Sequence, residues 1–372
     1  MLYFHIPFCK QKCSYCNFHF STSLRGKDDM LNAIKKEVEL RHQELEKRSI
    51  SSLYFGGGTP SLLEVRELSG LLETSAKYYD FDADIEITLE TNPDDLDADF
   101  LKALSKSGIN RLSIGVQSFF EADLRLMNRA HSVIQAEDAI KRAQDFGFDN
   151  LSIDLIYGSS SLSIWQRNLQ KAVELGVPHI SSYALTVEPK TALNKWVEDK
   201  LVKAPNEDIQ NSEFHYMSHF LQEHDFIHYE ISNFAKKDFY SKHNSAYWNA
   251  APYIGFGPSA HSFNGKRERS WNIANNFLYI KGIAENRRNF EKEKLSPKDQ
   301  LNEWVMIGLR TLRGVDIKAL KSSFEEDVLD EFNKHLTSKK DQGLVVEEEG
   351  FLKIPQVYWF LADGIASDLF LI

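Results

Sequence analysis

The sequence predicts an α/β fold followed by a small helical domain, with domains expected at residues 1–290 and 291–372. Two observations predict it. Six short apolar segments with strand character alternate with segments in which apolar residues recur at helical spacing. After about residue 290 the order changes to helices followed by two short strands. Such alternation implies parallel strands with right-handed crossovers, hence either an α/β barrel or a doubly wound sheet. Spacing alone leaves both architectures open.

The expected elements follow from local patterns. In the first domain we expect strands at 2–6, 52–55, 85–90, 111–116, 150–156 and 179–185. Helices are expected at 28–48, 64–79, after residue 119, and at 163–175. In the second domain, helices are expected at 304–312, 317–322 and 326–338, then strands at 344–348 and 351–354 with Gly350 at the turn. This last order resembles a winged helix.

Composition limits the function classes. The chain has 372 residues, 42% hydrophobic and 26% charged, which is ordinary for a globular protein with a large core. Its net charge of −10 argues against a nucleic-acid binder, which would carry a basic surface, and residues 324–331 of the expected winged helix are acidic. No apolar run is long enough to cross a bilayer, and Cys9 comes too early for a signal peptide. Free thiols indicate the cytoplasm. Peripheral membrane contact and a homodimer stay open.

The three cysteines of the chain, Cys9, Cys13 and Cys16, fall within eight residues directly after the first expected strand. A disulfide would use two of them and leave one unpaired. A structural zinc ion needs a fourth ligand, which His19 could supply. An iron–sulfur cube held by three thiolates would keep one iron open for another ligand. Three unrelated buried thiols are the remaining alternative.

Polar residues recur where successive strands are expected to end. The glycines of 56–58, Glu90, Gln117, Asp154 and Tyr183 occupy these positions, and the carboxyl ends of parallel strands build the active site in such folds. Gly57 and Gly58 would let the backbone approach a ligand, although a tight turn before Pro60 explains them equally.

The polar side chains suit a polar ligand. Glu90 and Asp154 can accept hydrogen bonds from ribose hydroxyls or an ammonium group, Gln117 can donate and accept, and Arg129 can pair with a carboxylate. Helix capping or exposure to solvent is the alternative for the two acids. Tyr3 and Tyr15 flank the cysteines and could stack there or pack in the core.

The C-x3-C-x2-C loop at the end of a first strand resembles the radical S-adenosylmethionine (SAM) superfamily. The resemblance implies a partial (β/α)6 TIM-like barrel and a [4Fe–4S] cluster on Cys9, Cys13 and Cys16. Its open iron is chelated by SAM, and reduction by an electron donor frees a 5′-deoxyadenosyl radical. The order of motifs resembles the coproporphyrinogen III dehydrogenase branch, in which one variant holds two SAM molecules. The matching positions then bind SAM: Tyr3, Tyr15, Gly57, Gly58, Thr59, Glu90, Gln117, Arg129 and Asp154.

Within that branch, three observations favour a haem chaperone of the HemW type over the oxidase. Phe18 stands where the oxidase has a fourth cysteine, and the chain begins almost at the cluster loop, without the oxidase's N-terminal segment. His243-Asn-Ser-Ala-Tyr247-Trp248 matches the H-N-x-x-Y-W motif associated with haem binding in that type. The resemblance implies that the protein binds haem and passes it to haem-accepting proteins. His243 is then the expected iron ligand, with Tyr247 and Trp248 covering the macrocycle.

Some assignments stay open at this point. His261 is a second candidate haem contact, and no catalytic residue is assigned. The oxidase, an oxygen-independent coproporphyrinogen III dehydrogenase, is the alternative function. A radical SAM enzyme that modifies nucleic acid is a weaker one, since the winged-helix pattern supports it and the charge opposes it.

Overall fold

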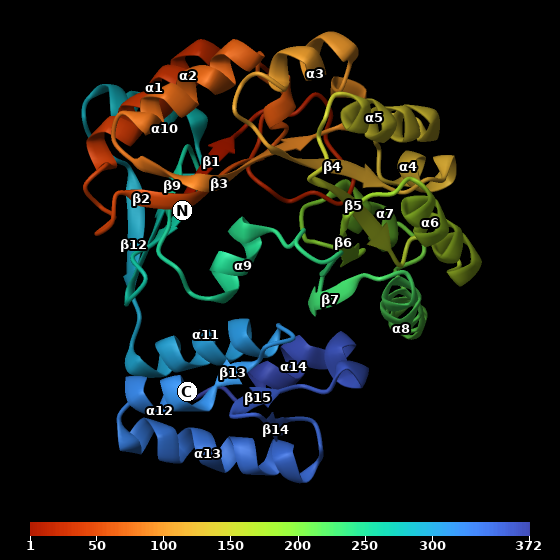
Figure 1. Cartoon of the computed structure of the whole chain (residues 1–372), viewed down its shortest axis with the longest axis vertical. Coiled ribbons are helices and arrows are strands. Elements are labelled where there is room, and N and C mark those ends of the chain that lie inside the picture. Colours follow the sequence, from red (N-terminus) through yellow and green to blue (C-terminus); the bar gives the residue numbers. More distant parts are fainter.

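A nine-stranded sheet forms the centre of the protein (Figure 1). The computed structural model describes residues 1–372. The strand order is β7-β8-β6-β5-β4-β3-β2-β1-β9. The strands are β1 (Leu2–Ile6), β2 (Ser49–Gly57), β3 (Asp80–Thr91), β4 (Arg111–Gln117), β5 (Leu151–Tyr157), β6 (His179–Ala184), β7 (Ile227–Glu230), β8 (Asn233–Ala235) and β9 (Ile254–Phe256).

The order of the first six strands decides between the two architectures. β1 to β6 pair in parallel, each with the next along the chain. A doubly wound sheet would reverse direction at a switch point, whereas a barrel-type sheet adds strands in sequence. The order therefore confirms the predicted α/β fold with six barrel-type strands. The sheet stays open, because β7 and β9 lie at its two edges.

Alternation along the parallel strands separates two faces. The outer face carries buried apolar residues, such as Phe4, Phe55 and Leu112, which pack in a single hydrophobic core. The inner face is polar, with Tyr54, Ser152 and other strand residues lining a cavity. Figure 1 shows the helices around the outside of the sheet and α9 on its inner side.

The helices of the larger part begin and end as follows. They are α1 (Lys27–Arg41), α2 (Val65–Ala76), α3 (Ala98–Leu104), α4 (Glu121–Leu126), α5 (Val133–Asp145), α6 (Leu162–Glu174), α7 (Ala192–Glu198), α8 (Glu207–Glu223), α9 (Lys242–Trp248) and α10 (Asn276–Ala284). Short 3₁₀ turns follow β2 and β3, at Pro60–Leu62 and Pro93–Asp95. A second, antiparallel sheet joins β10 (His261–Phe263), β11 (Glu268–Asn272) and β12 (Phe290–Lys294).

The C-terminal part follows the predicted order of helices and strands. It contains α11 (Pro297–Leu309), α12 (Ile317–Ser323), α13 (Glu326–Asp341), α14 (Ala362–Ser367) and a 3₁₀ segment at Gln356–Leu361. Its sheet has the order β13 (Val315–Asp316), β15 (Phe351–Lys353), β14 (Val346–Glu348). This part lies beneath the open side of the large sheet in Figure 1. The division at residue 290 stays a prediction. None of the helices combines the length and apolar character needed to cross a bilayer.

One expected helix is too long and several elements were not expected. The helix predicted at 28–48 ends at Arg41, although Leu45 is buried beyond its end, so the apolar spacing ran past the true helix. Arg41 bonds the carbonyl of Gly255 and the hydroxyl of Ser262, and with Glu37 it ties α1 to the region of β9. Strands β7 to β9, with three or four residues each, were too short to give a pattern.

Candidate functional site: a cysteine-lined cavity

The glycine turn after β2 holds the base of the cysteine loop. The amide of Gly58 donates to Ile6 O at 2.9 Å, and the amide of Thr59 donates to Phe8 O at 2.6 Å. A Cβ on Gly58 would lie 2.4 Å from Phe8 O. The turn thus needs glycine for close packing against the chain that enters the loop, where the sequence had suggested approach to a ligand.

The cysteine loop is fixed at both its ends and its middle. Backbone bonds of 2.9 Å from Cys9 N to Ser21 O and from Ser21 N to Pro7 O close its base. In the middle, Ser14 Oγ donates to Leu126 O at 2.7 Å and Ser14 N donates to Met127 O at 3.1 Å. These contacts attach the loop to the end of α4, and none of them involves a cysteine sulfur.

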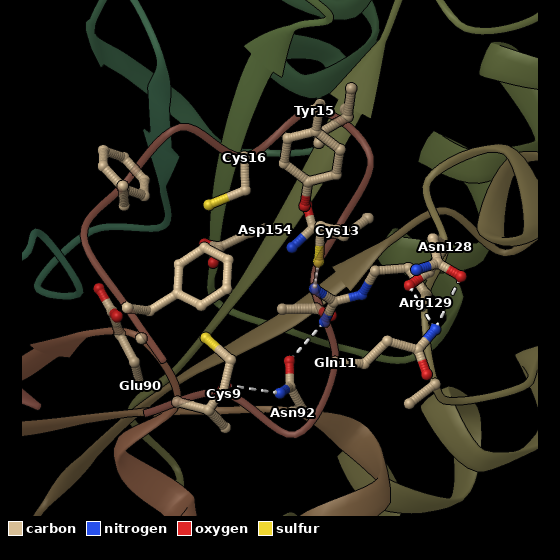
Figure 2. Close-up of a pocket in the computed structure, with 18 of the residues that line it drawn as sticks. Cys9, Gln11, Cys13, Tyr15, Cys16, Glu90, Asn92, Asn128, Arg129 and Asp154 are labelled. Atoms are coloured by element: carbon tan, nitrogen blue, oxygen red, sulfur yellow. Dashed lines mark hydrogen bonds between the residues drawn. The ribbon is translucent and has the colours of Figure 1, made fainter. Parts of the chain in front are cut away.

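All three cysteines line one cavity of about 630 Å³ (Figure 2). It lies at the carboxyl end of the parallel strands, since residues from the ends of β2 to β6 complete its wall. Burial raises the pKa of Cys9 to about 11 and also raises the pKa of Cys16. The metal-free thiols of Cys9 and Cys16 are therefore protonated at neutral pH, so iron binding through them must release protons.

The alternative zinc site loses its fourth ligand. His19 does not line the cysteine cavity, and its Nε2 is bonded to Asn276 Oδ1 at 2.7 Å. No three Cys, His, Asp or Glu side chains stand close enough together to hold a single metal ion.

Arg129 connects the loop to the strand ends. Its Nη1 donates to Cys13 Sγ at 3.2 Å, and its Nη2 donates to Gly115 O at 2.7 Å and to Asn92 Oδ1 (Figure 2). The guanidinium therefore joins one cysteine sulfur of the loop to β4. Nε of Arg129 is buried without a protein partner. The sequence had assigned Arg129 to a ligand carboxylate, and most of its donors are instead committed to the protein.

Two carboxylates face the cavity with altered acidity. Glu90 accepts from Tyr54 Oη at 2.8 Å and from Gly57 N at 3.2 Å, and Asp154 accepts from Ser113 Oγ at 3.3 Å. Burial raises the pKa of Glu90 to about 7 and the pKa of Asp154 to about 6. Both groups can therefore change protonation near neutral pH, which is typical of functional sites.

The structure brings most of the predicted SAM contacts into the cysteine cavity. Its wall includes Tyr15, Gly57, Gly58, Thr59, Glu90, Gln117, Arg129 and Asp154. Gln117 has a φ of 67°, which is unusual for a residue other than glycine and marks a strained end of β4. Asn92 and Asn128 also line the cavity and were not assigned; only their positions beside predicted residues could have signalled them.

Tyr3 and His243 lie elsewhere. They line an inner cavity of about 260 Å³ that adjoins the cysteine cavity, because Glu90 and Asp154 border both. His243 is 1% exposed. Its Nδ1 is bonded to Ser52 Oγ at 2.9 Å and its Nε2 to Tyr247 Oη at 3.2 Å. In this conformation neither ring nitrogen is available to a haem iron, and the predicted ligation by His243 stays a prediction.

The other members of the haem motif face different spaces. Tyr247 borders the inner cavity and also two larger ones, of about 710 and 780 Å³. Trp248 borders the 780 Å³ cavity, against the C-terminal part, with the guanidinium of Arg310 5.1 Å from its ring centre. The six-residue motif is therefore distributed over three spaces around one short helix.

Comparisons with known proteins agree with this architecture. A family model of the radical SAM superfamily matches residues 3–166, and one of the HemN C-terminal domain matches residues 295–357. The haem chaperone HemW of Lactococcus lactis is 32% identical over 94% of this chain and 93% of its own length. The chain belongs to the HemW family of radical SAM proteins. HemW of Bacillus subtilis is likewise 32% identical, over 93% of each chain.

A solved structure supports the fold independently. Coproporphyrinogen III oxidase HemN from Escherichia coli, a radical SAM enzyme, matches with a TM-score of 0.85 and 24% identity, covering 99% of this chain and 89% of that chain. At that identity the match shows the shared fold alone.

The site fits the cofactors of the family, a [4Fe–4S] cluster and SAM. Three thiols face one cavity, as a cluster with one open iron requires. The same cavity presents acceptors in Glu90 and Asp154, and the Gln117 side chain, which has no hydrogen bond within the protein, suits a ligand rich in hydroxyl and amino groups. Its volume is in the usual range of ligand pockets. A bound cluster that receives one electron from a reductant would supply a 5′-deoxyadenosyl radical from SAM.

Proposed function

We propose that this protein binds haem and transfers it to haem-accepting proteins, beside a [4Fe–4S] cluster that coordinates SAM. One structural observation carries the proposal beyond family membership. A cavity of about 710 Å³ with aromatic and histidine side chains shares a wall with the cysteine cavity. A flat apolar macrocycle with an iron centre needs both kinds of side chain.

The oxidase and the nucleic-acid-modifying enzyme have less support. The structural match to the oxidase carries the fold, and the relatives that cover nearly the whole chain at 32% identity are named haem chaperones. A nucleic-acid substrate is disfavoured because α13 begins with Glu326 and Asp327 and the chain carries a net charge of −10.

The proposed setting is the cytoplasm, where thiols stay reduced and an electron donor can reduce the cluster. Peripheral contact with a membrane and a homodimer belong to the same proposal. Vesicle flotation and light scattering of the reconstituted protein test these two.

The test uses the full chain with its cluster reconstituted without oxygen. Ferric haem is titrated into the protein, and the loaded protein is mixed with apomyoglobin as a general acceptor. The same samples are assayed for conversion of coproporphyrinogen III. We expect one haem bound per chain, transfer to apomyoglobin faster than release to buffer, and no conversion. Sustained conversion without stoichiometric haem uptake would establish the oxidase instead, and retention of RNA with neither result would favour the nucleic-acid enzyme.

A further inference from the structure

The cavity of about 710 Å³ is built from segments far apart in the chain. The cysteine loop contributes Phe18 and His19, β1 contributes Tyr3 and His5, and the region of β9 and β10 contributes His261. We refer to it as the histidine cavity. It shares residues 17, 18, 57 and 90 with the cysteine cavity, so its occupant would lie next to the SAM site.

Its walls suit a flat aromatic ligand. Tyr3, Tyr247 and Tyr253 line it, and Phe18 on the cysteine loop is 70% exposed beside it. The volume is in the range of sites that enclose cofactor-sized ligands.

Of its three histidines, only His261 has both ring nitrogens free of hydrogen bonds within the protein. His5 is 6% exposed, and its ring nitrogens contact Tyr3 Oη at 3.4 Å and His19 O at 2.9 Å. His19 bonds Asn276 Oδ1 through Nε2, which leaves its Nδ1 without a partner. His261 is exposed, and its ring makes no hydrogen bond within the protein.

Neighbouring residues hold the ring of His261 in place and keep it uncharged. Its ring stacks on Trp271 with a centroid distance of 5.7 Å and an interplanar angle of 24°. Partial desolvation by the cavity wall and the nearby Arg269 lower the pKa of His261, so its imidazole is neutral at physiological pH and keeps a lone pair available. β10 is fixed behind it, because Ser262 Oγ bonds both Gly255 N and Arg41.

We propose that haem binds in the histidine cavity with His261 as the axial ligand of its iron, and that His243 positions Tyr247 in the cavity wall. The imidazole lone pair of His261 forms the bond to iron as a water ligand leaves, and no oxidation or reduction is needed. This inference rests on the proposed function. The cavity beside Trp248 offers four basic side chains but no histidine, which leaves it without an imidazole ligand.

The test compares axial ligation in four proteins: wild type, His261→Gly, His243→Gln and the control His219→Gly. His219 lies on α8 with its side chain 77% exposed. Ferric haem is titrated into each anaerobic, cluster-loaded protein and followed by absorption and electron paramagnetic resonance. Circular dichroism and iron content establish that each variant is folded. If His261→Gly does not fold, His261→Gln replaces it in the titration.

We expect His261→Gly to lose the imidazole-ligated spectrum and to bind haem at least tenfold more weakly. Added imidazole should restore the spectrum by filling the space of the lost ring. His219→Gly should match wild type, and His243→Gln should keep the imidazole-ligated spectrum but bind haem more weakly, because Tyr247 loses its partner in the cavity wall. An unchanged spectrum and affinity in His261→Gly would overturn the assignment, as would loss of ligation in His243→Gln alone. Failure of the wild type to take up haem would instead reject the proposed function.

Discussion

The cysteine loop and helix α9 both carry a sequence motif, but their key side chains differ in what they contact. Both backbones are firmly held: the loop by Ser14 and its closed base, and α9 by the buried carboxylate of Glu86, which accepts from His243 N at 3.0 Å. The thiols of the loop face a cavity. Both ring nitrogens of His243 are hydrogen-bonded to protein partners.

A residue within a motif can therefore act in one of two ways: it can bind a ligand, or it can hold neighbouring residues in place. A residue whose functional atoms face a cavity can bind a ligand directly. A residue whose atoms are fully bonded and buried acts by fixing its neighbours, since breaking those bonds leaves buried groups unsatisfied. The following changes test that distinction, from the largest expected effect to the smallest.

Replacing Cys13 by alanine should abolish the cluster and leave the fold intact. We expect iron to fall from about four atoms per chain to near zero, because two thiolates cannot hold the cube. The unfolding free energy of the metal-free protein should change by less than about 1 kcal/mol, since Ser14 and the loop base anchor the chain. Iron and sulfide analysis and chemical denaturation measure both. Lys12→Ala, an exposed neighbour, is the control; normal iron content in Cys13→Ala would contradict the cluster assignment.

Replacing Glu86 by alanine should destabilise α9 strongly. Its carboxylate accepts from Lys242 N and His243 N, both at 3.0 Å, and from Ser241 Oγ at 3.4 Å. Losing it leaves these buried donors unsatisfied at a helix N-terminus, which we expect to cost about 2–3 kcal/mol of unfolding free energy. Glu73→Ala, at an exposed position of α2, should have little effect. Equal denaturation midpoints for the two variants would show that α9 does not depend on Glu86.

Acid should reveal how deeply His243 is buried. Burial lowers the pKa of His243 to about 3, against about 6.5 in the unfolded chain. Below pH 6.5 the unfolded histidine binds a proton and the folded one does not, so stability falls as pH decreases toward 3. His243→Gln removes this pH-dependent contribution to the unfolding free energy. The stability advantage of wild type over the variant should therefore shrink by up to about 1.4 kcal/mol per pH unit. Denaturation at pH 7, 6 and 5 measures it; a gap that stays constant would mean that His243 is accessible to protons.

Replacing Ser14 by alanine should loosen the cysteine loop slightly. It removes the 2.7 Å hydrogen bond to Leu126 O, for an expected loss of about 1 kcal/mol. Iron should be lost to a chelator several times faster than from wild type, because the loop opens more often. Ser51→Ala, at an exposed position of β2, is the control. A chelation rate equal to wild type would assign the loop's rigidity to its base alone.

Local patterns predicted much of the fold. The six parallel strands were found because each is an apolar run bounded by turns, and the ends of those strands indicated Glu90, Gln117 and Asp154 as neighbours. β9 could not be found: its three residues, Ile254 to Phe256, become a strand only through pairing with β1. The sequence also could not tell that His243 faces inward, since its burial depends on Ser52 from a distant strand.

The closed base of the cysteine loop has a consequence for maturation. The hydrogen bonds that hold the loop come from Ser14 and from the backbone of Cys9 and Ser21, and no cysteine sulfur takes part, so they can form before the cluster is inserted. We therefore expect the apoprotein to resist proteolysis almost as well as the loaded form, and extensive cleavage within residues 7–21 of the apoprotein would refute this order of events.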